Sequence, residues 1–217
     1  MKTSLLTCLL LSLSLTAIAQ QKWPEKSYLA FGAGMAKPFG EFGSKDYTNT
    51  NAGLADNGLL VNAEFGSYLT RYFGVGASYT LRRNAVDVSE HPLYSGRNAI
   101  YIHTKWRSNF ILINALAIYP VTGKLAVFGK LSGGASINTY PDQSYSTASS
   151  AKNKDLIKSE ALAYGTAAGI KFLPGNVGLT FETSALFTEP VFKGSSLSAR
   201  QAMNSLNYSL ALNFKLK

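Results

Sequence analysis

The chain has 217 residues, of which 46% are hydrophobic and 15% are charged, and its formal net charge is +9. The basic residues are scattered rather than gathered in a run, which argues against nucleic acid as a partner and suits contact with anionic lipid head groups. The only cysteine is Cys8, so a disulfide framework is excluded.

Residues 1–19 have the pattern of a cleaved secretory signal peptide. Lys2 supplies a positive start, residues 5–15 are apolar, and Ala17-Ile18-Ala19 forms a small-residue cleavage site. The apolar run is shorter than the ~20 residues that a membrane-spanning helix needs, which argues against an N-terminal anchor. We therefore expect one domain, residues 20–217, with a net charge of +8, from 20 basic minus 12 acidic residues.

Eight stretches after residue 26 alternate apolar residues with small or polar ones, which predicts β-strands with one apolar face. In the last stretch the alternation is unbroken, because every even position from 206 to 216 is apolar or aromatic. Since about ten residues of tilted strand cross the hydrocarbon of a bilayer, this strand is long enough to span one. The predicted strands are 27–36, 59–69, 73–82, one within 101–119, 125–139, 156–172, 177–188 and 204–217.

The fourth stretch has the weakest alternation. Phe110 and Leu112 lie on one parity, but Ile111 and Ile113 lie on the other. The pattern predicts a strand without showing which face it turns inward, and a buried helix over 110–118 is the alternative for so short an apolar run.

The connections alternate between short turns, around Arg71, Gly123 and Gly175, and long polar loops. Antiparallel strands then place every short turn and both termini at one rim, and every long loop at the other. Unpaired strand edges are too costly in lipid, so we expect the last strand to pair with the first. With a signal peptide and an even strand number, this predicts an all-β, eight-stranded antiparallel transmembrane β-barrel of a bacterial outer membrane.

A soluble, ligand-carrying barrel of lipocalin type, with its apolar face inward, is the alternative fold. The non-apolar strand faces consist mostly of Gly, Ala, Ser and Asn. Such faces suit a crowded lumen better than a solvated exterior, which normally carries more charge.

Four short motifs carry a family resemblance: 38–42 (PFGEF), 72–76 (YFGVG), the glycine pair 133–134, and the tail 212–217 (LNFKLK). In these the chain resembles the small outer-membrane β-barrel family of Bacteroidetes, PorT-like eight-stranded barrels related in shape to the membrane domain of outer membrane protein A. The resemblance covers nearly all of the mature chain, and it implies assembly by the barrel-assembly machinery and no cofactor. Such barrels often end on an aromatic residue, whereas Lys217 is last here.

A few charged residues fall on the predicted inward faces. Three of them, Glu64, Lys130 and Glu182, lie about six residues from their short turns, so modest strand stagger places them at similar depth. Opposite charges there should pair, because an isolated buried charge is costly. We expect a plug that fixes the packing, with a gate or ion path as the alternative. The predicted lumen charge cluster is Glu64, Arg82, Lys130, Lys171 and Glu182, with Arg107 as a further candidate.

Aromatic residues gather near the predicted strand ends, which is typical of two girdles at the membrane interfaces. Ordinary strand propensity of aromatics is the alternative explanation. On the short-turn side they are Trp23, Tyr72, Phe73, Phe172 and Phe214, and on the loop side Phe42, Tyr79, Trp106 and Phe187.

The sequence favours a non-enzymatic, structural or surface-interaction role, with outer-membrane lipid, lipopolysaccharide and an unidentified partner of the loops or the periplasm as contacts. A narrow channel or an accessory of a secretion apparatus is the second class. A lipid A-modifying enzyme using His103 with Ser108 or Ser78 is the third. A narrow filled lumen argues against Glu64 and Glu182 as an acid–base pair, and His91 and His103 make a poor metal signal.

Overall fold

The computed structural model describes residues 26–46, 48–87, 101–102, 105–141, 143–144, 157–193 and 198–216. The predicted signal peptide and Trp23 lie outside these residues. No helix in the described ranges is long and apolar enough to cross a membrane.

Eight long strands form the body of the molecule, and two of them, β6 and β9, have the predicted bounds. The strands are β1 (Ser27–Pro38), β2 (Ala55–Tyr68), β3 (Phe73–Val86), β5 (Trp106–Pro120), β6 (Leu125–Thr139), β8 (Lys158–Phe172), β9 (Val177–Thr188) and β12 (Ser205–Leu216).

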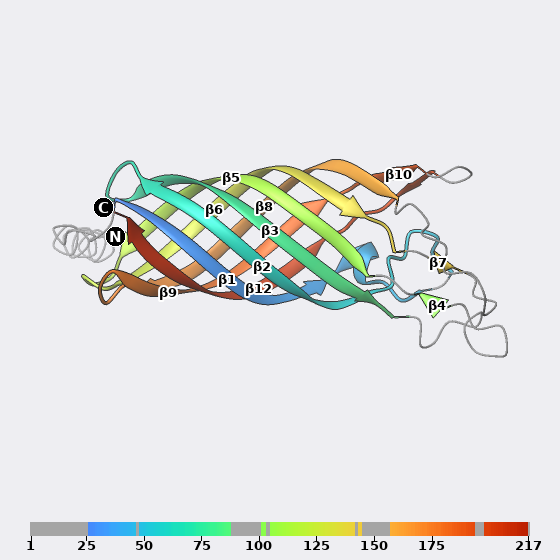
Figure 1. The fold of residues 1–217 in the computed structure, drawn as a ribbon, viewed down its shortest axis with the longest axis horizontal. Helices are drawn as coiled ribbons and strands as arrows, with labels where there is room; N and C mark the ends of the chain where they lie inside the picture. The colour runs from blue at the N-terminus through green and yellow to red at the C-terminus, as the bar shows by residue number, and fades with distance from the viewer. Residues whose placement is uncertain are drawn as a thin grey trace, which may run out of the picture.

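These strands close into an antiparallel barrel in the order β1-β12-β9-β8-β6-β5-β3-β2, so every long strand is paired on both sides (Figure 1). Closure is made by β1 and β12, whose register runs from Ser27 opposite Leu216 to Pro38 opposite Ser205. The predicted fold and the predicted pairing of the first strand with the last are therefore confirmed.

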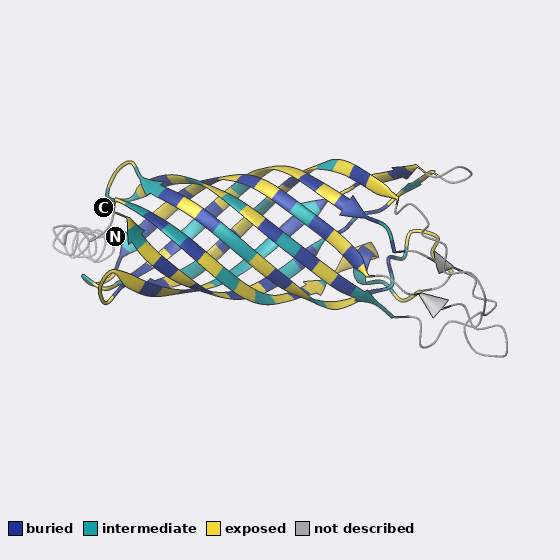
Figure 2. Cartoon of the chain, viewed as in Figure 1, coloured by how far each residue is buried: buried dark blue, intermediate teal, exposed yellow. Residues whose placement is uncertain are grey.

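Exposed and buried residues alternate along each strand, which gives the barrel wall a chequered pattern in Figure 2. The apolar faces point outward, as the exposure of Leu131, Leu210 and Phe181 shows. In β5 the open question of facing is settled: Phe110 and Leu112 are buried, whereas Ile111 and Ile113 are exposed. Both faces of this strand are apolar because one meets the lumen packing and the other forms part of the apolar exterior. Arg107 is on the outward parity and is exposed, so it does not belong to the lumen.

Several ladders extend further toward the loop rim than the apolar alternation predicts. β2 begins at Ala55 and β3 reaches Val86, with a bulge between Ala55 and Gly58. The outward residues of this extension include Asp56 and Arg83, which are polar. Because these outward residues are polar, the alternation of apolar and polar residues did not reveal the extended part of the β2–β3 ladder.

Short elements lie within segments that the sequence suggested were loops. They are the 3-10 helix η1 (Gly40–Gly43), in which Gly40 has a φ of 63°, and the paired short strands β4 (Tyr101–Ile102) with β7 (Gln143–Ser144) and β10 (Val191–Lys193) with β11 (Ser198–Arg200). All of them lie at the loop end of the barrel (Figure 1).

Apolar and polar layers succeed each other inside the barrel, and β5 crosses all of them. Apolar clusters lie at each end and on both sides of a polar middle. From the loop rim to the short-turn rim, the buried residues of β5 are Trp106, Ser108, Phe110, Leu112, Asn114, Leu116, Ile118 and Pro120.

Candidate functional site in the barrel lumen

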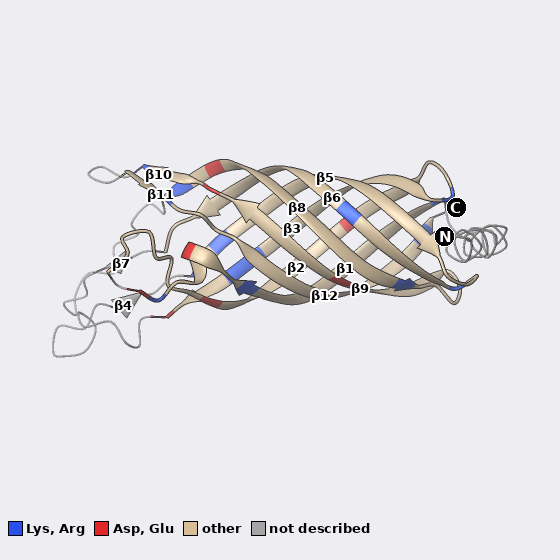
Figure 3. Cartoon of the chain, turned by 180° about the vertical axis from the view of Figure 1, so that it is seen from behind, with Lys and Arg blue, Asp and Glu red and all other residues tan. Residues whose placement is uncertain are grey.

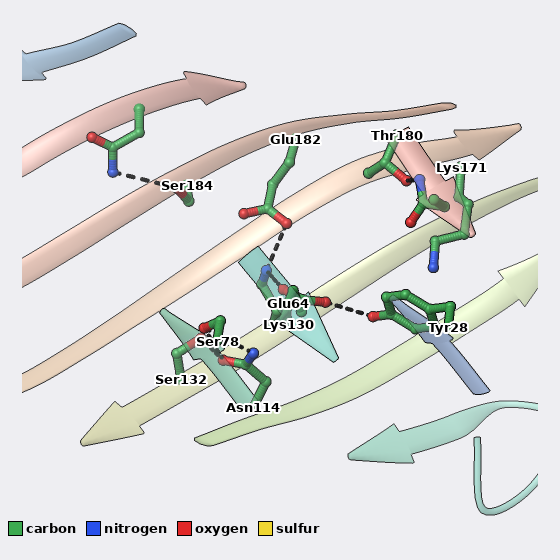
Figure 4. A network of polar contacts seen from close by, with 12 residues as sticks. Tyr28, Glu64, Ser78, Asn114, Lys130, Ser132, Lys171, Thr180, Glu182 and Ser184 are labelled. Atoms are coloured by element: carbon green, nitrogen blue, oxygen red, sulfur yellow. Dashed lines mark hydrogen bonds and ion pairs between the residues drawn. The ribbon is translucent and has the colours of Figure 1, made fainter. Parts of the chain in front are cut away.

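A buried ion cluster occupies the middle of the lumen (Figure 4). Lys130 of β6 donates to Glu64 of β2 and to Glu182 of β9, at 2.7 Å in each case. The side chains of Lys130 and Glu64 are less than a tenth exposed. Because β2 and β6 are not neighbours in the barrel, these ion pairs connect strands across its axis.

Tyr28 connects Lys171 to this cluster. Its hydroxyl donates to Glu64 Oε1 at 2.5 Å, and the Nζ of Lys171 lies 3.3 Å from the centre of its ring. Lys171 also donates to the hydroxyl of Tyr68 at 3.0 Å. Tyr28 thus lies between the Lys171 ammonium, which faces its ring, and the Glu64 carboxylate, which accepts from its hydroxyl. Two carboxylates and two ammonium groups leave the cluster formally neutral.

The lack of a side chain at Gly66 makes room for the ring of Tyr28. A Cβ atom added at Gly66 would lie 2.4 Å from two ring carbons of Tyr28. The two residues are cross-strand partners in β1 and β2, so the absence of a side chain at 66 permits the close approach.

Neutral hydrogen bonds surround the ion cluster. The amide of Asn114 donates to Ser78, and its carbonyl oxygen accepts from Ser132 at 2.8 Å. Asn213 donates to Thr180 at 2.7 Å. These bonds satisfy buried polar groups that would otherwise destabilise the lumen.

Two small cavities remain, one on each side of the cluster. Their volumes are about 30 and about 20 Å³, and Glu64 and Glu182 line both. A cavity of this size holds no more than one or two water molecules. Side chains therefore fill the lumen at this depth, as the small diameter of an eight-stranded barrel leads one to expect.

Arg82 lies closer to the loop rim, apart from the other charges. It is 1% exposed, and its guanidinium donates to Ser205, Ser108 and the carbonyl oxygen of Met203. Its Cζ lies 5.0 Å from the ring centre of Phe42 and 5.1 Å from that of Phe110. The predicted five-residue cluster is thus two sites, a four-residue cluster in the middle and Arg82 between two aromatic rings.

Trp106 was predicted to belong to the outer girdle, and this is wrong. It is buried beneath the loops, where it contacts Phe42, Tyr140 and Phe192, and its indole donates to the carbonyl oxygen of Gly53 at 2.9 Å. Trp106 has the inward parity of β5, and η1 folds Phe42 over the lumen. Burial in this group raises the pKa of the Tyr140 hydroxyl. We call Phe42, Trp106, Tyr140 and Phe192 the aromatic cap.

Phe42 was also predicted to belong to the loop-side girdle, and this is wrong too, because its side chain is fully buried. The remaining described girdle residues are at least partly exposed. Phe73, Phe172 and Phe214 lie toward the short turns, and Tyr79 lies toward the loops. Tyr72 and Phe187 are half-buried.

Little in the described lumen is arranged for catalysis or metal binding. Ser108 accepts from Arg82, and Ser78 is hydrogen-bonded to Asn114. His91 and His103 lie outside the described residues. Within the described ranges, no group of three or more His, Cys, Asp or Glu side chains could hold a metal ion.

Neither a protein-family model nor a curated protein matches the chain. Solved structures do match. The chain is similar to the Neisserial surface protein A, with 13% identity and a TM-score of 0.59 over 88% of this chain and 97% of that one. It is also similar to the outer membrane protein OprG from Pseudomonas aeruginosa, with 14% identity and a TM-score of 0.50 over 90% of this chain and 98% of that one. Likeness at such identity shows the fold alone. The chain has the closed eight-stranded fold of the Gram-negative outer-membrane β-barrels.

Sequence reasoning missed the contributions of Tyr28 and Tyr68 to the site. Both lie on the inward parity of their strands. For Tyr28, the available signal was an aromatic residue on a face of the predicted strand 27–36 otherwise made of Ala and Gly.

Proposed function

We propose that the protein resides in the outer membrane as a closed, non-conducting barrel and acts through the surface formed by its long loops. The role is structural or one of surface interaction, and it requires no enzymatic chemistry. The observation that supports it best is the ion cluster of Glu64, Lys130 and Glu182, which joins three strands across the lumen and leaves cavities of only about 20 and about 30 Å³.

The proposed orientation places the short turns and both termini in the periplasm and the long loops outside the cell. Outer-membrane barrels have short periplasmic turns and longer extracellular loops. The described strands begin and end at the short-turn rim, since Ser27 pairs with Leu216 there. Export by a cleaved signal peptide at residues 1–19 and insertion by the barrel-assembly machinery accompany this proposal, as does the likeness to Bacteroidetes barrels of PorT type.

Conductance of the purified protein in planar lipid bilayers tests the closed lumen. We expect no steady ion current for the unmodified protein, because the cluster lies across the axis of the barrel. Replacing Glu64 by Ala removes one carboxylate and enlarges the adjoining cavities, so this variant should conduct more or lose stability. Lys37→Ala, at an exposed site on β1, is the matched control and should resemble the unmodified protein.

A large and steady current through the unmodified protein would reject the closed barrel. It would favour the narrow channel or the accessory of a secretion apparatus. The two small cavities flank the cluster, so the path in that case would pass between Glu64 and Glu182.

A further inference from the structure

The pairing between β8 and β9 is incomplete at the loop rim, and we call this junction of the two strands the seam. β8 pairs with β6 from Lys158 to Phe172, but its pairing with β9 begins only at Ala163 opposite Thr188. Residues 158–162 of β8 are therefore paired on one side. Beyond Thr188 the chain leaves β8 and forms the β10–β11 hairpin, in which Val191 pairs with Arg200.

Side chains close this seam toward the lumen. Thr188 donates through its hydroxyl to the carbonyl oxygen of Leu162 at 2.9 Å, and Ser159 donates to that of Val191 at 2.8 Å. On the inner side the hydroxyls of Ser136 and Thr188 are 2.7 Å apart. The seam is thus open to the exterior and has a hydrogen-bonded floor, so it forms a groove and not a passage into the barrel.

The groove has a volume of about 980 Å³ and lies between β8, the β10–β11 hairpin and η1. This is within the range of sites that hold a small organic molecule, roughly 300–1,000 Å³.

The lining of the groove changes from apolar to charged along the barrel axis. Leu162 and Tyr164 lie toward the middle of the barrel and are 84% and 62% exposed. Tyr164 stacks on Phe187, with ring centres 5.2 Å apart. Glu160 and Lys193 also line the groove, nearer the loop rim, where Figure 3 shows charges of both signs beside β10 and β11.

The charged end carries both signs. Arg200 donates to Glu189 at 2.6 Å, and Glu41, Glu160 and Lys193 complete a set of three acidic and two basic residues. Such a set offers partners to a head group that bears both a phosphate and an ammonium. It is less suited to a head group with several negative charges, because like charges repel at short distance.

We propose that this groove binds one glycerophospholipid, with an acyl chain over Leu162 and Tyr164 and a zwitterionic head group at the charged end. This inference rests on the proposed placement in a bilayer and goes beyond the closed barrel, since it assigns a ligand site to the outer wall. Aromatic side chains at this height are typical of the membrane interface, where an apolar surface beside charges matches an amphiphile.

The test is native mass spectrometry of the mature chain, after reconstitution into vesicles of phosphatidylethanolamine and phosphatidylglycerol in equal amounts and stepwise removal of lipid with detergent. We expect the unmodified protein to retain one phosphatidylethanolamine molecule. Leu162→Asn should lower the retained fraction about tenfold, because an acyl chain loses its apolar contact there. Leu131→Asn, at a site 67% exposed on the outward face of β6, is the matched control and should retain the lipid.

A second variant tests the charged end of the groove without changing Leu162. Lys193→Glu, on the exposed β10 hairpin, should weaken retention of phosphatidylethanolamine without altering the heat-modifiable gel migration of the folded barrel. Equal retention by both groove variants and the Leu131→Asn control would overturn the proposal, as would a preference for phosphatidylglycerol. Failure of the bilayer placement would look different, because the unmodified protein would then stay in water and carry no lipid at all.

Discussion

Lys130 holds two carboxylates in place at the centre of the barrel, so it is the residue whose loss should matter most to the lumen. Removing one member of a buried ion pair leaves an uncompensated charge, which costs about 3–5 kcal/mol. In Lys130→Met, Glu64 and Glu182 lose their common partner. We expect the free energy of unfolding, measured by urea titration in lipid vesicles, to fall by about that amount.

Two further variants show whether the charges themselves cause this loss. Lys37→Met removes an exposed ammonium and should leave the unfolding free energy nearly unchanged. The quadruple variant Glu64→Gln, Lys130→Met, Lys171→Met, Glu182→Gln keeps no charged side chain in this cluster and should recover much of the stability. A quadruple variant as unstable as Lys130→Met would contradict the electrostatic explanation.

Gly66 offers a second test at the residue scale. A methyl group at this position would overlap the ring of Tyr28, so Gly66→Ala must displace the ring and disturb its bond to Glu64. We expect a loss of about 1–3 kcal/mol in unfolding free energy, which is typical of overpacking. Gly133→Ala is the matched control, because a Cβ there would meet no atom within 4 Å. Equal effects of the two substitutions would contradict the packing role of Gly66.

Each strand presents an apolar face outward, and a charge placed on that face should be penalised according to its depth in the bilayer. Ile113 lies in the middle of β5 and is 73% exposed, and Leu69 lies at a short turn and is 68% exposed. We expect Ile113→Arg to cost about 2–4 kcal/mol and Leu69→Arg only about 0–1 kcal/mol in unfolding free energy measured in vesicles. In a barrel surrounded by water, both substitutions would be nearly neutral.

The strands themselves could be predicted well where a period of two is flanked by short turns. β6 and β9 have their predicted bounds because Gly123 and the turn at 173–176 mark their starts and their outward faces are apolar. β5 could not be oriented, because Phe110 and Leu112 meet other side chains in the lumen while Ile111 and Ile113 lie on the exterior. An apolar residue satisfies either environment, so its type carries no information on facing.

The candidate site was predictable in part. Inward parity and the distance from the short turns indicated that Glu64, Lys130 and Glu182 lie at one depth, and their ion pairs follow from that placement. Arg82 pairs opposite Leu60, four residues nearer the loop rim than Glu64, so its separation follows from its position along β3. Its contact with the ring of Phe42 was not predictable, since it depends on η1 folding Phe42 over the lumen. Trp106 was misplaced for the same reason, because strand-end position alone does not distinguish an outer girdle from an inner cap.

The molecule as a whole combines an apolar exterior, a lumen closed by ion pairs and an aromatic cap beneath the loops. In the proposed function no solute passes through the lumen, and the loop end and the lateral groove are the surfaces available for recognition. The lumen cluster and the cap both join strands that are not neighbours, so each stabilises the closed barrel as a unit.

The most direct test of this account is flotation of the mature chain with lipid vesicles on a density gradient, after refolding in the absence of detergent. The account predicts that the folded, heat-modifiable protein floats with the vesicles and resists extraction by alkaline carbonate, because hydrocarbon covers its outward faces. A folded monomer that remains in the aqueous fraction, with the vesicles free of protein, would contradict it.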